Sequence, residues 1–353
     1  MPEIESSPKR ILIIRLSAIG DVIMASGLIP ALRKAYPNAH IAWLTESPNA
    51  DLLRHNPRLD RVYLWPRSRW RTLRQERHYR EFAREAYDLI HALRAERFDW
   101  VLDLQGLLKS GVWAWLSGGR RRIGLGSREG SQFLMTEIID RSVDDFRIGK
   151  EYRKLAETLT GQINTFALDT AVSEDDRKKG RELLESAGVT GEYAVICPFT
   201  TRPQKHWFDD RWIDLAQRLT YRHRLPVVLL GGPGDRSRAE PIVHGVRHGL
   251  FDLTGRTTLG QCAALIEKAR LLIGVDTGLT HLGIALGVPT LAIFGSTRPY
   301  LDTGRATARV LYEPLECSPC RRRPTCGGTF DCMRLHTVDQ VFDAASELLE
   351  GRS

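Results

Sequence analysis

The chain has 353 residues, of which 42% are hydrophobic and 27% are charged, and these ordinary fractions exclude wholesale disorder. Its length predicts two ordinary domains or one large domain. The net charge is +8 and the isoelectric point is about 9.3. The basic surplus lies in the first half, because residues 1–150 carry 25 Lys and Arg against 18 Asp and Glu, whereas residues 151–353 carry 26 Lys and Arg against 25 Asp and Glu.

Short apolar segments alternate with amphipathic ones along the whole chain. We predict strands at 11–16, 40–45, 61–65 and 99–104 and helices at 21–36 and 107–116 in the first half. After a loop-like stretch from residue 161 and a helix at 175–188, the second half continues with strands at 193–199, 226–232, 271–275 and 289–295 and helices at 208–223, 262–269, 280–287 and 336–351. Such alternation is typical of parallel sheets with helices on both faces.

The fold class is therefore α/β, with two Rossmann-like domains whose parallel sheets face a central cleft, the usual place for a substrate. We expect a first domain at 1–165, a linker at 166–190, a second domain at 191–335 and a C-terminal helix at 336–353. The polar start of the chain is unlike a signal peptide, and no apolar run near it approaches the roughly 18–20 residues that a bilayer requires. We therefore expect a cytoplasmic protein, whose basic half binds an anionic partner.

Asp21 is the first candidate site residue. It follows the strand at 11–16 and opens a helix, so it lies at the carboxyl end of a parallel sheet, where ligands bind. The alternative role is a simple helix N-cap.

A second candidate follows the strand at 271–275, where Asp276, Thr277 and Gly278 open a helix that carries His281. Exposed N–H groups at a helix start suit a pyrophosphate, although an N-cap followed by a core histidine would have the same pattern. The order of residues is not the glycine pattern of dinucleotide cofactors.

Two loops after strands could complete such an anion site. The first, at 198–207, contains Thr200, Thr201 and Lys205, of which Lys205 would be a mobile cation for a leaving phosphate. The second, at 231–235, ends in Asp235, which could accept a hydrogen bond from a ribose hydroxyl. Both loops could instead be solvated connections.

Arginines cluster in the basic half. Residues 66–84 contain seven, including Arg69 and Arg71, and a second cluster contains Arg120 and Arg122. Guanidinium groups bind carboxylates and phosphates, so these positions are candidates for binding an anionic partner. The alternative for 66–84 is a solvated helix face with Glu–Arg pairs.

Four cysteines, Cys317, Cys320, Cys326 and Cys332, lie within a short segment near the C-terminus. Four thiolates can enclose a structural Zn²⁺, although the spacing is not that of a standard zinc ribbon, so reduced or redox-sensitive thiols are the alternative.

Four segments in order, at 12–46, 101–111, 200–207 and 275–295, resemble the lipopolysaccharide heptosyltransferases of glycosyltransferase family 9. The Arg-rich stretch and the segments at 103–111 and 200–207 look most like the heptosyltransferase I members, and heptosyltransferase II or another family member with a different acceptor stays open.

The resemblance implies a GT-B fold, an N-terminal domain that takes the acceptor and a C-terminal domain that takes ADP-heptose. It implies that Asp21 is the catalytic base, that Thr200, Thr201 and Lys205 meet the donor phosphates, and that Asp276, Thr277, Gly278 and His281 bind the donor. Arg69 and Arg71 match acceptor-side arginines, and Asp235 stands where the family usually has a Glu for the ribose.

The implied reaction is inverting and independent of metal, with a Kdo-lipid A acceptor and a peripheral location on the cytoplasmic face of the inner membrane. A nucleic-acid binder would also explain the charge, and an NAD-dependent oxidoreductase would explain two Rossmann-like halves. The chain shows no helix-turn-helix or RNA-stacking pattern, and its first strand–helix turn lacks the glycine triplet, so neither alternative is favoured.

Overall fold

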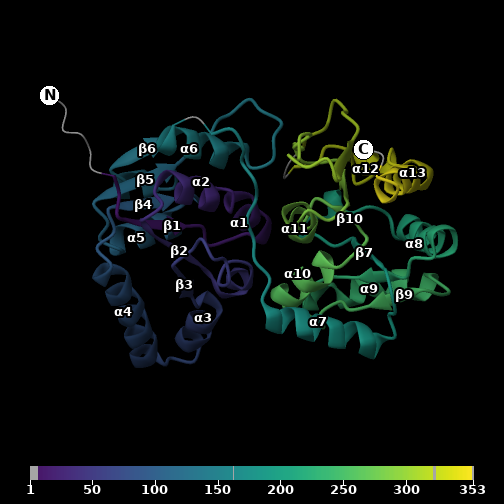
Figure 1. Ribbon diagram of the computed structural model, residues 1–353, viewed down its shortest axis with the longest axis horizontal. Coiled ribbons are helices and arrows are strands. Elements are labelled where there is room, and N and C mark those ends of the chain that lie inside the picture. The colour runs from purple at the N-terminus through teal and green to yellow at the C-terminus, as the bar shows by residue number, and fades with distance from the viewer. Residues whose placement is uncertain (1–6, 162, 321–322, 352–353) are drawn as a thin grey trace. The chain divides into compact units, whose positions relative to one another are not determined.

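The computed structural model describes residues 7–161, 163–320 and 323–351, which form two compact units (Figure 1). Unit 1 comprises residues up to 145 together with 149–171, and unit 2 comprises 146–148 together with residues from 172 onward. The helix predicted at 175–188 is α7, Glu174–Ala187, and it belongs to unit 2. No described helix is both long and apolar enough to cross a membrane.

Unit 1 contains one six-stranded parallel sheet with the order β3-β2-β1-β4-β5-β6. The strands are β1 (Arg10–Ile14), β2 (His40–Glu46), β3 (Arg61–Trp65), β4 (Trp100–Asp103), β5 (Arg121–Leu125) and β6 (Glu137–Ile139). The helices are α1 (Ile19–Ala25), α2 (Leu28–Ala35), α3 (Arg67–Gln75), α4 (Tyr79–Ala95), α5 (Leu108–Leu116) and α6 (Lys150–Thr160), with the 3₁₀ turns η1 (Ser47–Leu52) and η2 (Ser131–Leu134).

Strand β1 shows how the sequence builds this layered core. Ile11 and Ile13 pack with α1, α2 and α6, whereas Leu12 and Ile14 pack with α3, α4 and α5. All four side chains are fully buried, as expected where alternate residues of a strand face two helical layers.

The helix predicted at 21–36 is wrong in one respect, because it is two helices. α1 ends at Ala25 and α2 begins at Leu28. A Cβ at Gly27 would lie 2.5 Å from the ring of Phe166, so the turn between the helices is pressed against a distant part of the chain. Local periodicity could not reveal this long-range contact.

Unit 2 repeats the design with the strand order β12-β11-β10-β7-β8-β9, again all parallel. The strands are β7 (Ala194–Cys197), β8 (Val227–Leu229), β9 (Leu250–Asp252), β10 (Leu271–Val275), β11 (Thr290–Phe294) and β12 (Ala308–Tyr312). Besides α7, the helices are α8 (Asp209–His223), α9 (Arg236–Gly245), α10 (Leu259–Glu267), α11 (Gly278–Leu286), α12 (Asp331–Arg334) and α13 (Val338–Leu349), with the 3₁₀ turns η3 (Pro203–Lys205) and η4 (Pro233–Asp235).

The α/β class with two Rossmann-like sheets is thus confirmed. In each unit one of the two innermost strands, β1 or β10, has a parallel neighbour on both sides. Side chains that follow these strands and their neighbours therefore gather at one edge, and these two edges carry the candidate sites.

Candidate functional site

The carboxyl edge of the unit 2 sheet brings together most of the residues predicted to bind an anion. Thr200, Thr201 and Lys205 follow β7, and Asp276 and Thr277 follow β10, the strand paired with β7. The Lys205 Nζ lies 2.5 Å from Asp276 Oδ2 and donates a second bond, 3.3 Å long, to the Asp276 carbonyl oxygen. Asp235 follows the adjacent strand β8, where its Oδ2 accepts a hydrogen bond from the Gly232 N–H, 2.8 Å away.

Asp276 is the centre of this cluster. Its Oδ1 lies 3.4 Å from His281 Nε2, and its Oδ2 accepts a hydrogen bond from the Thr297 hydroxyl, 2.6 Å away. Burial works to raise the pKa of Asp276, but the hydrogen bond from His281 and the charge of Lys205 outweigh it, and the pKa lies well below its usual range. The carboxylate is therefore charged and saturated with donors.

His281 and Thr277 are positioned by the start of α11. Thr277 is the N-cap and has an extended backbone, so the first N–H groups of the helix are available to an anion. The His281 side chain is buried, and its Nδ1 lies 2.7 Å from the hydroxyl of Tyr300. Sequence reasoning missed Tyr300 and Thr297, which lie beyond the next strand.

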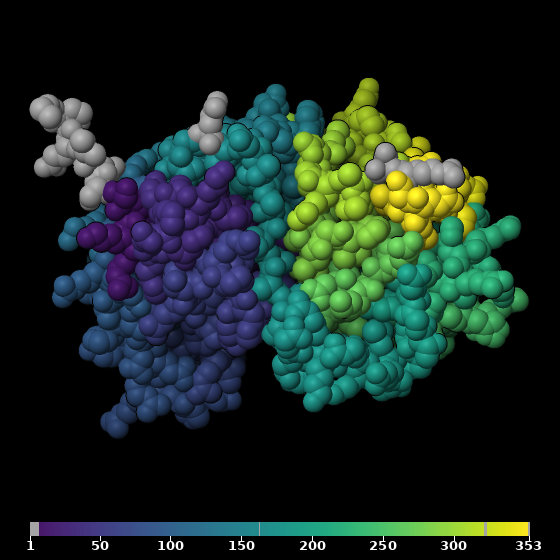
Figure 2. All heavy atoms as spheres, viewed as in Figure 1, coloured from purple at the N-terminus to yellow at the C-terminus, as the bar shows by residue number. Residues whose placement is uncertain are grey.

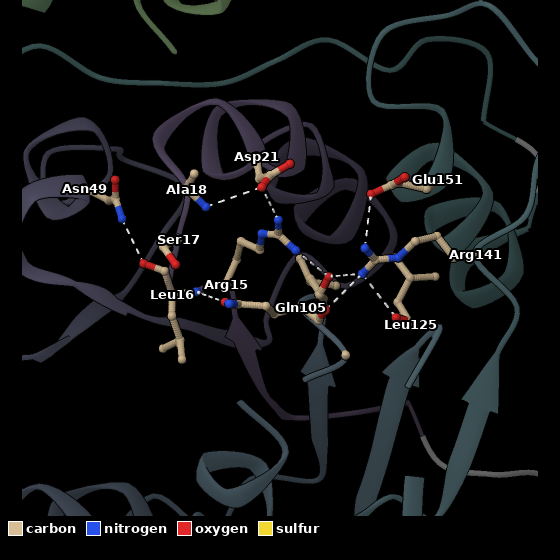
Figure 3. Close-up of polar contacts among 12 residues, drawn as sticks. Arg15, Leu16, Ser17, Ala18, Asp21, Asn49, Gln105, Leu125, Arg141 and Glu151 are labelled. Atoms are coloured by element: carbon tan, nitrogen blue, oxygen red, sulfur yellow. Dashed lines mark hydrogen bonds and ion pairs between the residues drawn. The ribbon is translucent and has the colours of Figure 1, made fainter. Parts of the chain in front are cut away.

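At the carboxyl edge of the unit 1 sheet, Asp21 lies in the first turn of α1, as predicted (Figure 3). Its Oδ2 forms an ion pair with the Arg15 guanidinium and accepts a 3.3 Å hydrogen bond from the Ala18 N–H. The Asp21 side chain is 38% exposed, and its Oδ1 makes no hydrogen bond or ion pair with any described residue. The carboxylate is held at one oxygen and open at the other.

Arg15 is a functional candidate that sequence reasoning missed, although a charge at the end of an apolar strand was a usable signal. Its side chain is 5% exposed, and its Nη1 donates a 2.9 Å bond to the Leu104 carbonyl. Burial works to lower the pKa of Arg15, but Tyr152 and Asp21 outweigh it and raise the pKa. Arg15 is therefore a buried, charged side chain that orients the Asp21 carboxylate through their ion pair.

Further polar side chains stabilise this edge (Figure 3). Gln105 accepts a 3.1 Å bond from the Leu16 N–H, and Asn49 donates a 2.8 Å bond to the Leu16 carbonyl. Arg141 donates to the carbonyls of Leu104 and Leu125, 2.6 and 3.1 Å away. The first two bonds tie the loop before Asp21 to the segments that follow β4 and β2, and Arg141 joins the carboxyl ends of β4 and β5.

The candidate acceptor arginines lie in different environments. Arg69 is held by Glu81 and Glu85, at 2.5 and 2.7 Å, as the alternative of a helix face with Glu–Arg pairs predicted. Arg122 donates to the carbonyls of Gly119 and Leu134, 2.9 and 2.8 Å away. Arg71 and Arg120 are exposed and form no ion pair with other described residues.

Arg71 also lines a cavity of about 1070 Å³ in unit 1, which we call the α3–α5 pocket. Its walls are largely aromatic and aliphatic, with a basic edge from α3, and include Trp65, Trp70, Trp113, Leu107, Arg67 and Arg74. An apolar hollow with a few cations fits an amphiphilic anion.

The four-cysteine segment gives no support to the expected zinc site. Within the described residues, no group of three or more His, Cys, Asp or Glu is placed to hold a metal ion. Cys332 is buried, whereas Cys317, Cys320 and Cys326 are partly exposed, and all four thiols are free. Backbone N–H groups of Phe330 and Gly328 lower the pKa of the Cys326 thiol.

A family model described as glycosyltransferase family 9 (heptosyltransferase) matches residues 86–329. The chain is 30% identical to lipopolysaccharide heptosyltransferase 1 of Pseudomonas aeruginosa over 328 residues, which cover 90% of this chain and 87% of that protein.

Among solved structures, the glycosyl transferase family 9 protein of Veillonella parvula DSM 2008 matches with a TM-score of 0.81 and 24% identity, over 97% of both chains. The Escherichia coli heptosyltransferase WaaC with ADP-2-deoxy-2-fluoro heptose matches with a TM-score of 0.69 and 23% identity, over 96% of this chain and 99% of that one. These matches confirm the expected GT-B fold.

Proposed function

Because the chain belongs to glycosyltransferase family 9 and is a glycosyltransferase, we propose that it moves L-glycero-D-manno-heptose from ADP-heptose to a Kdo-lipid A acceptor in the assembly of the lipopolysaccharide inner core. The P. aeruginosa relative, named as a lipopolysaccharide heptosyltransferase 1, supports the substrate class. The WaaC structure with an ADP-heptose analogue supports the donor.

The donor diphosphate binds at the carboxyl edge of the unit 2 sheet. Asp276 holds the Lys205 ammonium at this edge, next to the open N-terminus of α11. Lys205, the hydroxyls of Thr200 and Thr201 and the N–H groups after Thr277 then stabilise the charge that develops on the leaving ADP. Gly278 allows close approach of the diphosphate, His281 orients Asp276, and Asp235 accepts a bond from the ribose.

Asp21 acts as the general base. Its open Oδ1 removes a proton from an acceptor hydroxyl. The hydroxyl oxygen forms a bond with the anomeric carbon while the bond from this carbon to the diphosphate breaks. Attack opposite the leaving group inverts the anomeric centre. The step needs no metal, since the leaving charge meets Lys205 and helix N–H groups.

The acceptor lies against unit 1, where the sequence indicates Arg69, Arg71, Arg120 and Arg122 as ligands of its carboxylates and phosphates. Arg69 and Arg122 are already held by other groups of the protein, whereas Arg71 and Arg120 are exposed. Arg71 is the best placed of these, because it is exposed and lies at the α3–α5 pocket. A lipid acceptor places the enzyme on the cytoplasmic face of the inner membrane, where anionic headgroups attract its basic half.

The observation that carries this proposal is the cluster of Lys205, Asp276 and His281, because it concentrates cationic and hydrogen-bonding groups at one sheet edge inside the segment matched by the family. The test is an assay of ADP-heptose with Kdo-lipid A and, separately, with its heptosylated product, followed by mass spectrometry. We expect one heptose on the first acceptor only. Transfer only to the second would show the acceptor class of heptosyltransferase II, and transfer to neither would refute the proposal.

A further inference from the structure

The outer face of α5 is apolar. Leu108, Val112 and Trp115 are 48%, 37% and 51% exposed, and they lie on one side of the helix because they are four and three residues apart. On the opposite side, Trp113 and Ala114 are buried in the core. The fold thus keeps three large apolar side chains in water on one helix face.

The neighbouring turn η2 adds a fourth. Phe133 is 85% exposed, more than any other large hydrophobic residue in the described chain. η2 packs tightly on α5, since a Cβ at Gly111 would lie 2.7 Å from Ser131 Cβ. We call Leu108, Val112, Trp115 and Phe133 together the α5 surface.

Basic side chains border the α5 surface. Leu108 and Val112 also line the α3–α5 pocket, together with Arg71 and Arg74 from α3. Neither arginine forms an ion pair with another described residue, and α3 contains no acidic residue. In Figure 2 the atoms of α3 and α4, in dark blue, form the lower part of the unit 1 surface.

This combination of groups favours a lipid surface. A contiguous exposed apolar patch marks an interaction site, and an exposed tryptophan prefers the headgroup level of a bilayer. Arginines beside it complement lipid phosphates. A second copy of the chain would bring two sets of unpaired arginines together, which the charge disfavours.

We propose that the α5 surface docks the protein on an anionic lipid bilayer, with Trp115 and Phe133 at the headgroup level and Arg74 against lipid phosphates. The inference rests on the proposed function only in that the same bilayer would carry the acceptor. The inference assigns membrane docking to α5 and η2 rather than to the positively charged N-terminal half of the chain as a whole.

The test compares three proteins in flotation with phosphatidylethanolamine vesicles that contain phosphatidylglycerol. We expect the wild-type chain to float with these vesicles and the double variant Trp115→Ser/Phe133→Ser to bind them at least about tenfold more weakly. The matched control is Tyr221→Ser, which removes a ring that is 70% exposed on α8 of unit 2 and should leave flotation unchanged. Brominated lipids should quench tryptophan fluorescence of the wild type more than that of a Trp115→Phe variant.

Equal flotation of the double variant and the wild type would overturn the proposal, as would equal binding to vesicles of phosphatidylcholine alone. A dimer that the double variant abolishes would show that a second copy covers the surface instead. A second assay separates this test from the proposed function. It measures heptose transfer to an acceptor without acyl chains, which requires no docking on a bilayer. The double variant should match the wild type in that assay, whereas a wild type without transfer refutes the proposed function and leaves the flotation result standing.

Discussion

Asp21 and Asp276 both lie at the carboxyl edge of a six-stranded parallel sheet, Asp21 in the helix that follows β1 and Asp276 directly after β10. Their surroundings differ. Asp276 is 13% exposed and meets Lys205, His281 and Thr297, whereas Asp21 is 38% exposed and uses one oxygen for Arg15 and Ala18. One carboxylate is saturated with donors, and the other keeps an open oxygen.

The comparison shows that a place at the carboxyl edge of a parallel sheet does not by itself decide the chemistry of an acidic group. A saturated carboxylate cannot accept a further proton easily, so Asp276 serves to hold cations for a donor anion. A half-open carboxylate fixed by a buried guanidinium is oriented for proton transfer. Substitutions at the two edges should therefore have different effects.

The largest effect is expected at the open carboxylate. Asp21→Asn removes the proton acceptor and should lower the turnover of ADP-heptose by about 10²–10⁴-fold. Binding of ADP, measured by calorimetry, should match that of the wild type, because Asp21 belongs to unit 1. The control is Asp88→Asn on the exposed side of α4, which should leave turnover unchanged. Near-normal turnover by Asp21→Asn would remove Asp21 from the mechanism.

The cation of the other edge should come next. Lys205→Ala removes a donor to the leaving diphosphate and should lower turnover by about 10²–10³-fold, with weaker ADP binding. Lys178→Ala, an exposed lysine of α7, is the matched control. If Lys205→Ala changes neither ADP affinity nor turnover, the donor does not use this edge as proposed.

Asp276 should affect stability in a way that depends on pH. Its pKa is lower in the folded protein than in the unfolded chain, so its charge stabilises the fold above the unfolded value, about 4, and this contribution disappears as the pH falls below it. Asp276→Asn should therefore lower the free energy of unfolding by about 3–5 kcal/mol at neutral pH, since it leaves the partly buried Lys205 ammonium without its partner.

The deficit of Asp276→Asn relative to the wild type should shrink between about pH 4 and pH 2 in urea titrations. Asp175→Asn, an exposed residue of α7 that pairs with Lys179, is the control and should cost under about 1 kcal/mol. A deficit that stays constant with pH would mean that the charge of Asp276 does not stabilise unit 2.

Much of the fold was predictable because its signals are local. Strands such as β1 and β10 are uninterrupted apolar runs, and α7 ends at Gly188, whose positive φ of 81° matches the predicted stop. The strands β5, β6, β9 and β12 were not predicted. Each has only three to five residues, at least one of them charged, so pairing with a neighbouring strand decides that they are strands.

The candidate sites were predictable as positions and not as contacts. Strand ends indicated Asp21, Lys205 and Asp276, since parallel sheets collect such side chains at one edge. The buried Arg15 and the distant Thr297 became visible only in three dimensions, because their partners are set by chain segments that no local pattern connects.

The smallest effects should separate the acceptor arginines of unit 1. Arg71 is exposed at the α3–α5 pocket, so Arg71→Ala should raise the KM for the acceptor by about fivefold to tenfold, with the KM for ADP-heptose unchanged. Arg122 binds the carbonyls of Gly119 and Leu134, and Arg122→Ala should lower the melting temperature and leave both KM values unchanged. If Arg122→Ala raises the acceptor KM as much as Arg71→Ala does, then exposure of an arginine in the unliganded protein does not identify the acceptor ligands. The contrast between side chains that are free to bind a ligand and side chains already bound within the protein would then fail in unit 1.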